Sequence, residues 1–127
     1  METYFLDWLE LVLRWIHVIT GIAWIGASFY FVWLDNSLEE PPRWKIDSGV
    51  KGELWAVHGG GIYEVGKYRL GPAKLPETLH WFKWEAYSTW LSGMVLMVLI
   101  FYVGADTYLI DPRISELSRI EAIVLGI

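Results

Sequence analysis

The chain has 127 residues, 54% of them hydrophobic and 17% aromatic, and its formal net charge is −5. Nucleic acids attract basic surfaces, so this acidic balance indicates no nucleic-acid partner. The sequence has no cysteine, which excludes disulfides, thiolate metal sites and the covalent attachment of a c-type haem through a C-x-x-C-H motif.

The first predicted element is a membrane-spanning helix over about residues 9–34. Between Leu11 and Leu34 only Arg14 and His17 can carry a charge. A helix rises about 1.5 Å per residue, so roughly 20 residues cross a hydrocarbon core of about 30 Å. Tryptophans near both ends of the stretch suit the headgroup layer of a bilayer. We therefore expect membrane lipids to surround this helix.

A polar insert follows over residues 35–77, and it is predicted to contain a β-hairpin at about 53–70. Two runs rich in aromatic and β-branched residues, Leu54–His58 and Ile62–Tyr68, flank a glycine triplet. Glycine supplies the positive φ angles that a tight hairpin turn needs.

A second span is predicted over residues 78–105. Its apolar part, WLSGMVLMVLIFYVGA, is extended by the preceding PETLHWFKWEAYST. A third helix begins at 114–127. Its apolar run reaches Ile127, which indicates the N-terminal piece of a larger membrane protein whose remaining helices are further partners. The expected fold class is an all-α integral membrane protein, with two full transmembrane helices, the start of a third, and the hairpin-containing insert between the first two.

The basic residues predict the orientation. One lies before the insert, at Arg14, and two lie after the second span, at Arg113 and Arg119. The 35–83 loop holds seven: Arg43, Lys45, Lys51, Lys67, Arg69, Lys74 and Lys83. Because cytoplasmic loops are enriched in Lys and Arg, we expect this loop in the cytoplasm and the N-terminus in the periplasm.

Within the first span, His17 and Gly21 are the candidate cofactor residues. An ionisable side chain inside a bilayer is costly and usually faces a helix bundle or cavity. A histidine ligates haem iron, and a glycine one turn on leaves room for the porphyrin, so His17 is a candidate ligand of a haem b iron. The alternative is a hydrogen bond from His17 to a neighbouring helix, with Gly21 serving close helix packing.

Two further groups of residues are candidates for catalysis. In HGGGIYEVGKY, the backbone N–H groups of the glycine triplet can bind an anion beside His58, Tyr63 and Lys67. The alternative is a plain hairpin turn with a solvated tip. In LHWFKWEAY, His80 and Glu85 stand out, although an interfacial aromatic belt and helix–helix hydrogen bonds explain much of that segment.

Long strings of the sequence resemble a known family. LRWIHVITGIAWIGASFYFVWLDNSL, GELWAVHGGGIYEVGKY, LPETLHWFKWEAYSTWLSG and GADTYLIDP resemble the N-terminal region of the bacterial membrane-bound urate oxidase (urate hydroxylase) family, from about Leu11 to Pro112. The resemblance implies a polytopic protein of the bacterial inner membrane, active in purine degradation, that oxidises urate to 5-hydroxyisourate. It also implies a C-terminal cytochrome portion with haem c, which passes electrons to the respiratory chain.

The leading functional hypothesis is therefore a membrane-bound urate-oxidising oxidoreductase linked to cytochrome c. This stretch lacks the C-x-x-C-H of the cytochrome portion, so we expect it to be inactive alone. The hairpin is expected to form part of a mouth for urate, a planar anion. The alternative from another class is a non-catalytic accessory transmembrane subunit of an electron-transfer or photosynthetic complex, with the hairpin as a binding surface.

Overall fold

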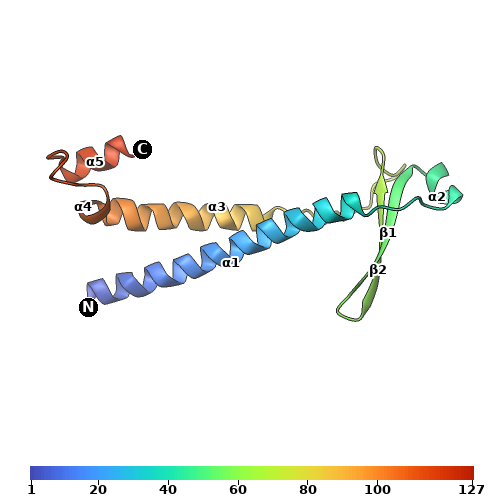
Figure 1. The fold of residues 1–127 in the computed structure, drawn as a ribbon, viewed down its shortest axis with the longest axis horizontal. Helices are drawn as coiled ribbons and strands as arrows, with labels where there is room; N and C mark the ends of the chain where they lie inside the picture. The colour runs from blue at the N-terminus through green and yellow to red at the C-terminus, as the bar shows by residue number, and fades with distance from the viewer. The chain divides into compact units, whose positions relative to one another are not determined.

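The computed structural model describes residues 1–127, apart from the side chain of Glu2. The element order is α1 (Glu2–Asn36), α2 (Arg43–Asp47), β1 (Val50–His58), β2 (Gly61–Tyr68), α3 (Trp84–Met97), the π-helix η1 (Val98–Val103), α4 (Ala105–Tyr108) and α5 (Arg119–Leu125) (Figure 1). The chain divides into two compact units. One combines Met1–Ile25 with Phe82–Ile127, and the other is Gly26–Trp81.

The expected all-α fold class is wrong, because the protein mixes helix and strand. Helices account for 56% of the residues, and β1 and β2 form a two-stranded antiparallel sheet. A glycine-bounded run of β-branched and aromatic residues favours a pleated ribbon, whereas glycines in a helix interior would be destabilising. The hairpin is a structural element of its own, with nine residues in β1 and eight in β2.

In the first unit, α1 and α3 run antiparallel, side by side (Figure 1). Two helices, Thr3–Asn36 and Trp84–Val103, are long and apolar enough to cross a membrane. The most apolar stretch of the first is 0% buried within the chain, and that of the second is 11% buried. Their side chains therefore present apolar surface outward, as helices do when lipid or further helices surround them.

The helix of the second span begins later than the sequence predicts. It starts at Trp84 instead of residue 78, and no side chain caps its first turn. Thr, His, Trp and Phe, which fill the preceding segment, lose rotamer freedom in a helix, and an isolated turn gains too few hydrogen bonds to offset that loss.

The last helix, α5, also begins later than expected, at Arg119 instead of residue 114. A capping box sets this start: Ser118 accepts a hydrogen bond from the backbone N–H of Glu121, and the Glu121 carboxylate accepts one from the Ser118 N–H at 2.8 Å. The Ser118 hydroxyl also donates to the Glu121 carboxylate at 2.7 Å, and this bond, together with the one from the Ser118 N–H, lowers the pKa of Glu121. Arg119 then donates to the backbone carbonyl of Val103 at 2.5 Å, which ties α5 to the end of η1.

The second unit is built around the hairpin. Segment 37–40 pairs with β1 through hydrogen bonds between the backbones of Glu39 and Glu53, at 2.8 and 3.1 Å. Gly52 makes this approach possible, because a Cβ there would lie 2.9 Å from the Cβ of Leu38. Leu34 and Val50 are buried in this unit, at 4% and 5% exposure.

Candidate functional site

The hairpin turn consists of two glycines in left-handed conformation. Gly59 has φ of 58° and Gly60 has φ of 82°, and positive φ at both central residues is the mark of a type I′ turn. This turn type matches the twist of the strands and sets the register, in which His58 pairs with Gly61 and Ala56 pairs with Tyr63. Successive side chains alternate between faces, so His58 and Tyr63 share one face of the hairpin.

Gly61 brings Tyr63 toward the tip. A Cβ at Gly61 would lie 3.0 Å from both Cε2 and the hydroxyl oxygen of Tyr63, so the phenol ring lies across the space that a side chain would fill. His58 is the cross-strand partner of Gly61. The phenol therefore leans toward the residue pair that contains the imidazole.

An aromatic groove of about 540 Å³ lies on this face, within the second unit. It is lined by Tyr30, Trp33, Ala56, Val57, His58 and Tyr63. The rings of Tyr30 and Trp33, on the C-terminal part of α1, lie 6.0 Å apart between centroids with a 38° tilt. The groove thus offers flat apolar faces for stacking, phenol hydroxyls for hydrogen bonds, and one imidazole that can exchange a proton. We call it the aromatic groove.

Lys67 does not line the aromatic groove. It lies four positions further along β2 than Tyr63, which is about 13 Å along a strand, and its ammonium pairs with Asp35 at 2.6 Å. It instead borders a charged hollow with Glu39, Glu40 and Lys51. Of the three hairpin residues singled out from the sequence, the structure brings His58 and Tyr63 together and leaves Lys67 apart.

The opposite face of the hairpin carries an ion cluster that sequence reasoning missed. The ammonium of Lys45, on α2, pairs with the carboxylates of Glu53 and Glu64, and it lies 5.2 Å from the ring centroid of Trp44 and 5.9 Å from that of Trp55. Hydrogen bonds to the two carboxylates raise the pKa of Lys45. The cluster fastens α2 to both strands.

Neither of the other two predicted catalytic residues lines the groove. His80 is exposed, in the helix-free segment before α3, and Glu85 is half-buried in the first turn of α3. They belong to different units, His80 to the hairpin unit and Glu85 to the other. An acidic residue in the first turn of a helix complements the helix dipole. This interaction explains the position of Glu85 in α3 even if the residue takes no part in catalysis.

His17 lies in the first unit, where it meets α3. Its Nδ1 is 3.1 Å from the backbone oxygen of Thr89 and 3.0 Å from Oγ of Ser92. Gly21, one turn on, allows close packing, because a Cβ there would lie 3.9 Å from Cγ2 of Thr89. Gly21 therefore makes the close helix–helix contact that the sequence analysis gave as its alternative role. The His17 ring is oriented by its contacts with α3.

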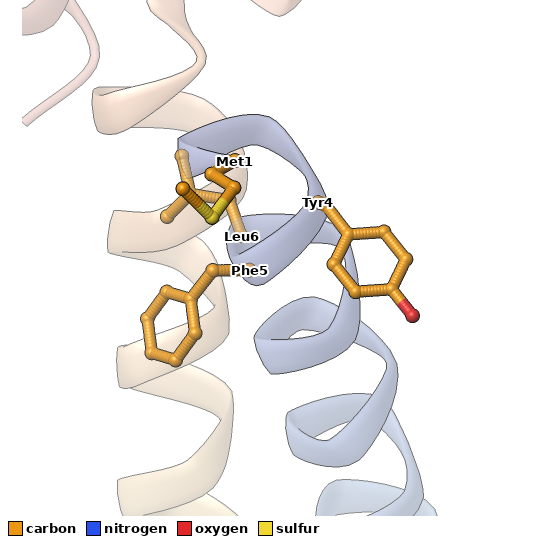
Figure 2. Close-up of a pocket in the computed structure, with 4 residues that line it drawn as sticks. All are labelled: Met1, Tyr4, Phe5 and Leu6. Atoms are coloured by element: carbon orange, nitrogen blue, oxygen red, sulfur yellow. The ribbon is translucent and has the colours of Figure 1, made fainter.

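One further hollow, of about 580 Å³, lies at the first turn of α1 and is almost entirely apolar. Figure 2 shows its lining residues Met1, Tyr4, Phe5 and Leu6, with Tyr4 and Phe5 pointing to different sides of the helix. No histidine or carboxylate lines it, so we assign it no chemical role.

The fold and the groove together define a chain with two membrane-compatible helices and an aromatic, histidine-bearing hairpin. A comparison with protein families matches residues 3–127 to the family described as urate oxidase N-terminal, and the chain belongs to this family. The match confirms the urate oxidase resemblance at the level of the family and fits a urate-oxidising oxidoreductase. Comparisons with curated proteins and with solved structures give no match.

Proposed function

We propose that this chain is the membrane-embedded N-terminal part of an oxidoreductase that converts urate to 5-hydroxyisourate and passes the electrons to a cytochrome c. The observation that carries the proposal is the family match over residues 3–127. The apolar, outward-facing helices support placement in a membrane, with lipids and the remaining helices of the protein as neighbours.

The proposed membrane is the bacterial inner membrane, with the N-terminus in the periplasm and the hairpin in the cytoplasm. Seven of the ten basic residues lie between 35 and 83, which favours a cytoplasmic loop. A cytoplasmic hairpin would meet urate where purines are degraded.

The aromatic groove is the proposed mouth for urate. Urate is a planar anion, and the rings of Tyr30, Trp33 and Tyr63 offer faces on which a planar ring can stack. His58 supplies a hydrogen-bond donor, and a positive charge when protonated. Lys67 is already paired with Asp35, so it does not contact urate directly. Its charge contributes only to the electrostatic potential around the groove.

In the proposed reaction, the urate monoanion and water give neutral 5-hydroxyisourate, one proton and two electrons. The water oxygen forms a bond to C5 of the purine, and one water proton moves to the imidazole of His58. A cytochrome c haem, when bound, would supply the acceptor for the two electrons. A positioned histidine suits the proton transfer because an imidazole nitrogen can both accept and donate a proton. His80 and Glu85 stay predictions, because the contacts of neither one support a role in this step.

The test is urate consumption by membranes that contain the protein at the full length its gene encodes. Loss of the ultraviolet absorbance of urate, with 5-hydroxyisourate as the first product, is the expected result. Membranes from the same host without the gene are the control. Equal urate loss in both preparations would contradict the proposal.

A further inference from the structure

The proton on the His17 ring can be located from its contacts. Nδ1 lies 3.1 Å from the carbonyl oxygen of Thr89, which can only accept a hydrogen bond. Its second partner, Oγ of Ser92 at 3.0 Å, already donates its own proton to the same carbonyl at 3.0 Å. Both partners therefore accept from His17, so Nδ1 carries the proton and Nε2 carries the lone pair.

Nε2 has no polar partner in the part of the chain that the structure describes. It is also not enclosed, because no fully buried side-chain nitrogen or oxygen among the described residues lacks a hydrogen bond. His17 lies near the middle of the apolar helix Thr3–Asn36, and Ser92 near the middle of Trp84–Val103. In a hydrocarbon environment water cannot satisfy this lone pair, so a group from outside the described chain has to meet it.

The arrangement around His17 is the one that metal-binding histidines use. Such a histidine usually donates its other ring N–H to a carbonyl or carboxylate, which fixes the tautomer and aims the free nitrogen at the metal. Gly93 adds to this positioning, since a Cβ there would lie 3.0 Å from Cε1 of the ring and displace it.

The kind of metal group that His17 could bind depends on the other ligands close to it. Among the residues whose side chains are described, no three of His, Cys, Asp and Glu lie close enough to hold a metal ion. A bare ion in this chain would lack ligands, whereas a metalloporphyrin brings four nitrogens and needs only one or two from protein. Its faces also require apolar walls. Leu13, one turn before His17, is one of two α1 residues that line an apolar groove of about 340 Å³, whose other wall is formed by α3 and η1 in the same unit.

We propose that Nε2 of His17 is an axial ligand of a haem b iron, with the imidazole held by the Thr89 carbonyl and the Ser92 hydroxyl. Ser92 and Thr89 are then positioning residues, because they act on the iron only through the ring. The inference goes beyond urate oxidation, since haem binding needs no assumption about the substrate.

The test is the haem content of the purified protein at full gene-encoded length. Acid–acetone extraction separates haem b from any covalently bound haem, and the pyridine haemochrome spectrum measures it. The wild type is expected to contain haem b. His17→Asn is expected to lose it, because the asparagine amide keeps a donor near Thr89 but offers no imidazole nitrogen to iron. His80→Asn, at an exposed site, is the matched control and should keep its haem b.

Two further variants separate ligation from folding. His17→Gly should regain the low-spin spectrum when imidazole is added, because free imidazole can occupy the vacated position. Ser92→Ala should keep haem b but bind it about tenfold more weakly, as loss of a group that orients a ligand does.

Wild-type protein that holds no haem b and binds no added haemin would overturn the inference. Unchanged haem content in His17→Asn would also overturn it, and His17 would then be a hydrogen-bond donor between helices only. Urate consumption in the same preparations keeps the two proposals apart. Activity without haem b would reject the haem site alone, and haem b without activity would reject the urate function alone.

Discussion

Nζ of Lys67 lies 2.6 Å from Oδ1 of Asp35, so strand β2 is joined to the C-terminal end of α1 by an ion pair. Both side chains are about half exposed, at 43% and 51%. The cation that the sequence singles out for anion binding is thus already partnered. This pair borders the charged hollow and not the aromatic groove.

The Lys67 pair predicts a small effect on both stability and urate binding. Exposed ion pairs contribute about 0.2–1 kcal/mol, so Lys67→Ala should lower the free energy of unfolding by no more than that. The KM for urate should change by less than about threefold, since 0.6 kcal/mol corresponds to roughly that factor. A tenfold rise in KM for Lys67→Ala would place this lysine at the substrate.

His58 is predicted to matter far more. His58→Ala should lower urate oxidation at least about tenfold, or roughly 1.4 kcal/mol of transition-state stabilisation, because proton transfer by a positioned side chain usually supplies that much or more. The fold should persist, since the side chain is exposed beside the turn. Ile62→Ala is the matched control, because Ile62 is 74% exposed on the same hairpin and does not line the aromatic groove. Equal kcat and KM in wild type and His58→Ala would reject this role.

The turn itself can be tested at its two glycines. Gly60→Val forces a β-branched residue into φ of 82° and should cost about 1–3 kcal/mol of hairpin stability. Gly59→Asn should be tolerated, because Asn-Gly is a preferred type I′ pair. Hydrogen exchange of the β1 and β2 amides measures the difference, with faster exchange expected in Gly60→Val only. Equal protection in the two variants would show that the turn does not hold the register.

The ion cluster predicts a pH dependence of the hairpin unit. The pKa of Lys45 is raised above its ordinary value of 10.5 by hydrogen bonds to Glu53 and Glu64. A raised pKa in the folded state means that the stabilisation is fully present below pH 10.5 and is lost as the pH rises through the folded value. Trp44 and Trp55 flank the ammonium, so their fluorescence should report the loss.

Lys45→Met is the control for that titration. It should remove the alkaline transition of the hairpin unit, because methionine keeps most of the side-chain volume and has no proton to lose. An identical transition in the variant would assign the pH dependence to another group.

The hairpin tip is predictable from sequence because its determinants are local. Consecutive glycines between aromatic and β-branched runs indicate a turn, and the pleat then places His58 and Tyr63 on one face. The rest of the aromatic groove depends on Tyr30 and Trp33, which approach the hairpin only through the fold of the whole unit. Periodicity within a segment carries no information about that approach.

Other features were missed for equally physical reasons. Lys45 pairs with Glu64, which lies 19 residues further along the chain, and no local sequence pattern specifies such a pairing. The S-x-x-E signal at Ser118 was available in the sequence and marks the start of α5. The tautomer of His17 follows only from the geometry of Ser92 and Thr89, since spacing along one helix cannot reveal what the neighbouring helix donates or accepts.

The proposed orientation can be read from a single cysteine. These 127 residues contain none, so Ser48→Cys adds a thiol at an exposed site beside α2, and the unsubstituted protein is the control for thiols elsewhere. A membrane-impermeant maleimide should label it only after the cells are permeabilised, because the 35–83 loop is proposed to be cytoplasmic. Labelling of intact cells would reverse the topology.

The most direct test of the account is the number of electrons that reach cytochrome c for each urate consumed. Oxidation of urate to 5-hydroxyisourate releases two electrons, so the full-length protein in membranes should reduce two cytochrome c haems per urate, without forming hydrogen peroxide. This ratio should hold whether or not oxygen is present. Urate loss that requires oxygen, yields peroxide in equal amount and leaves cytochrome c oxidised would contradict the account.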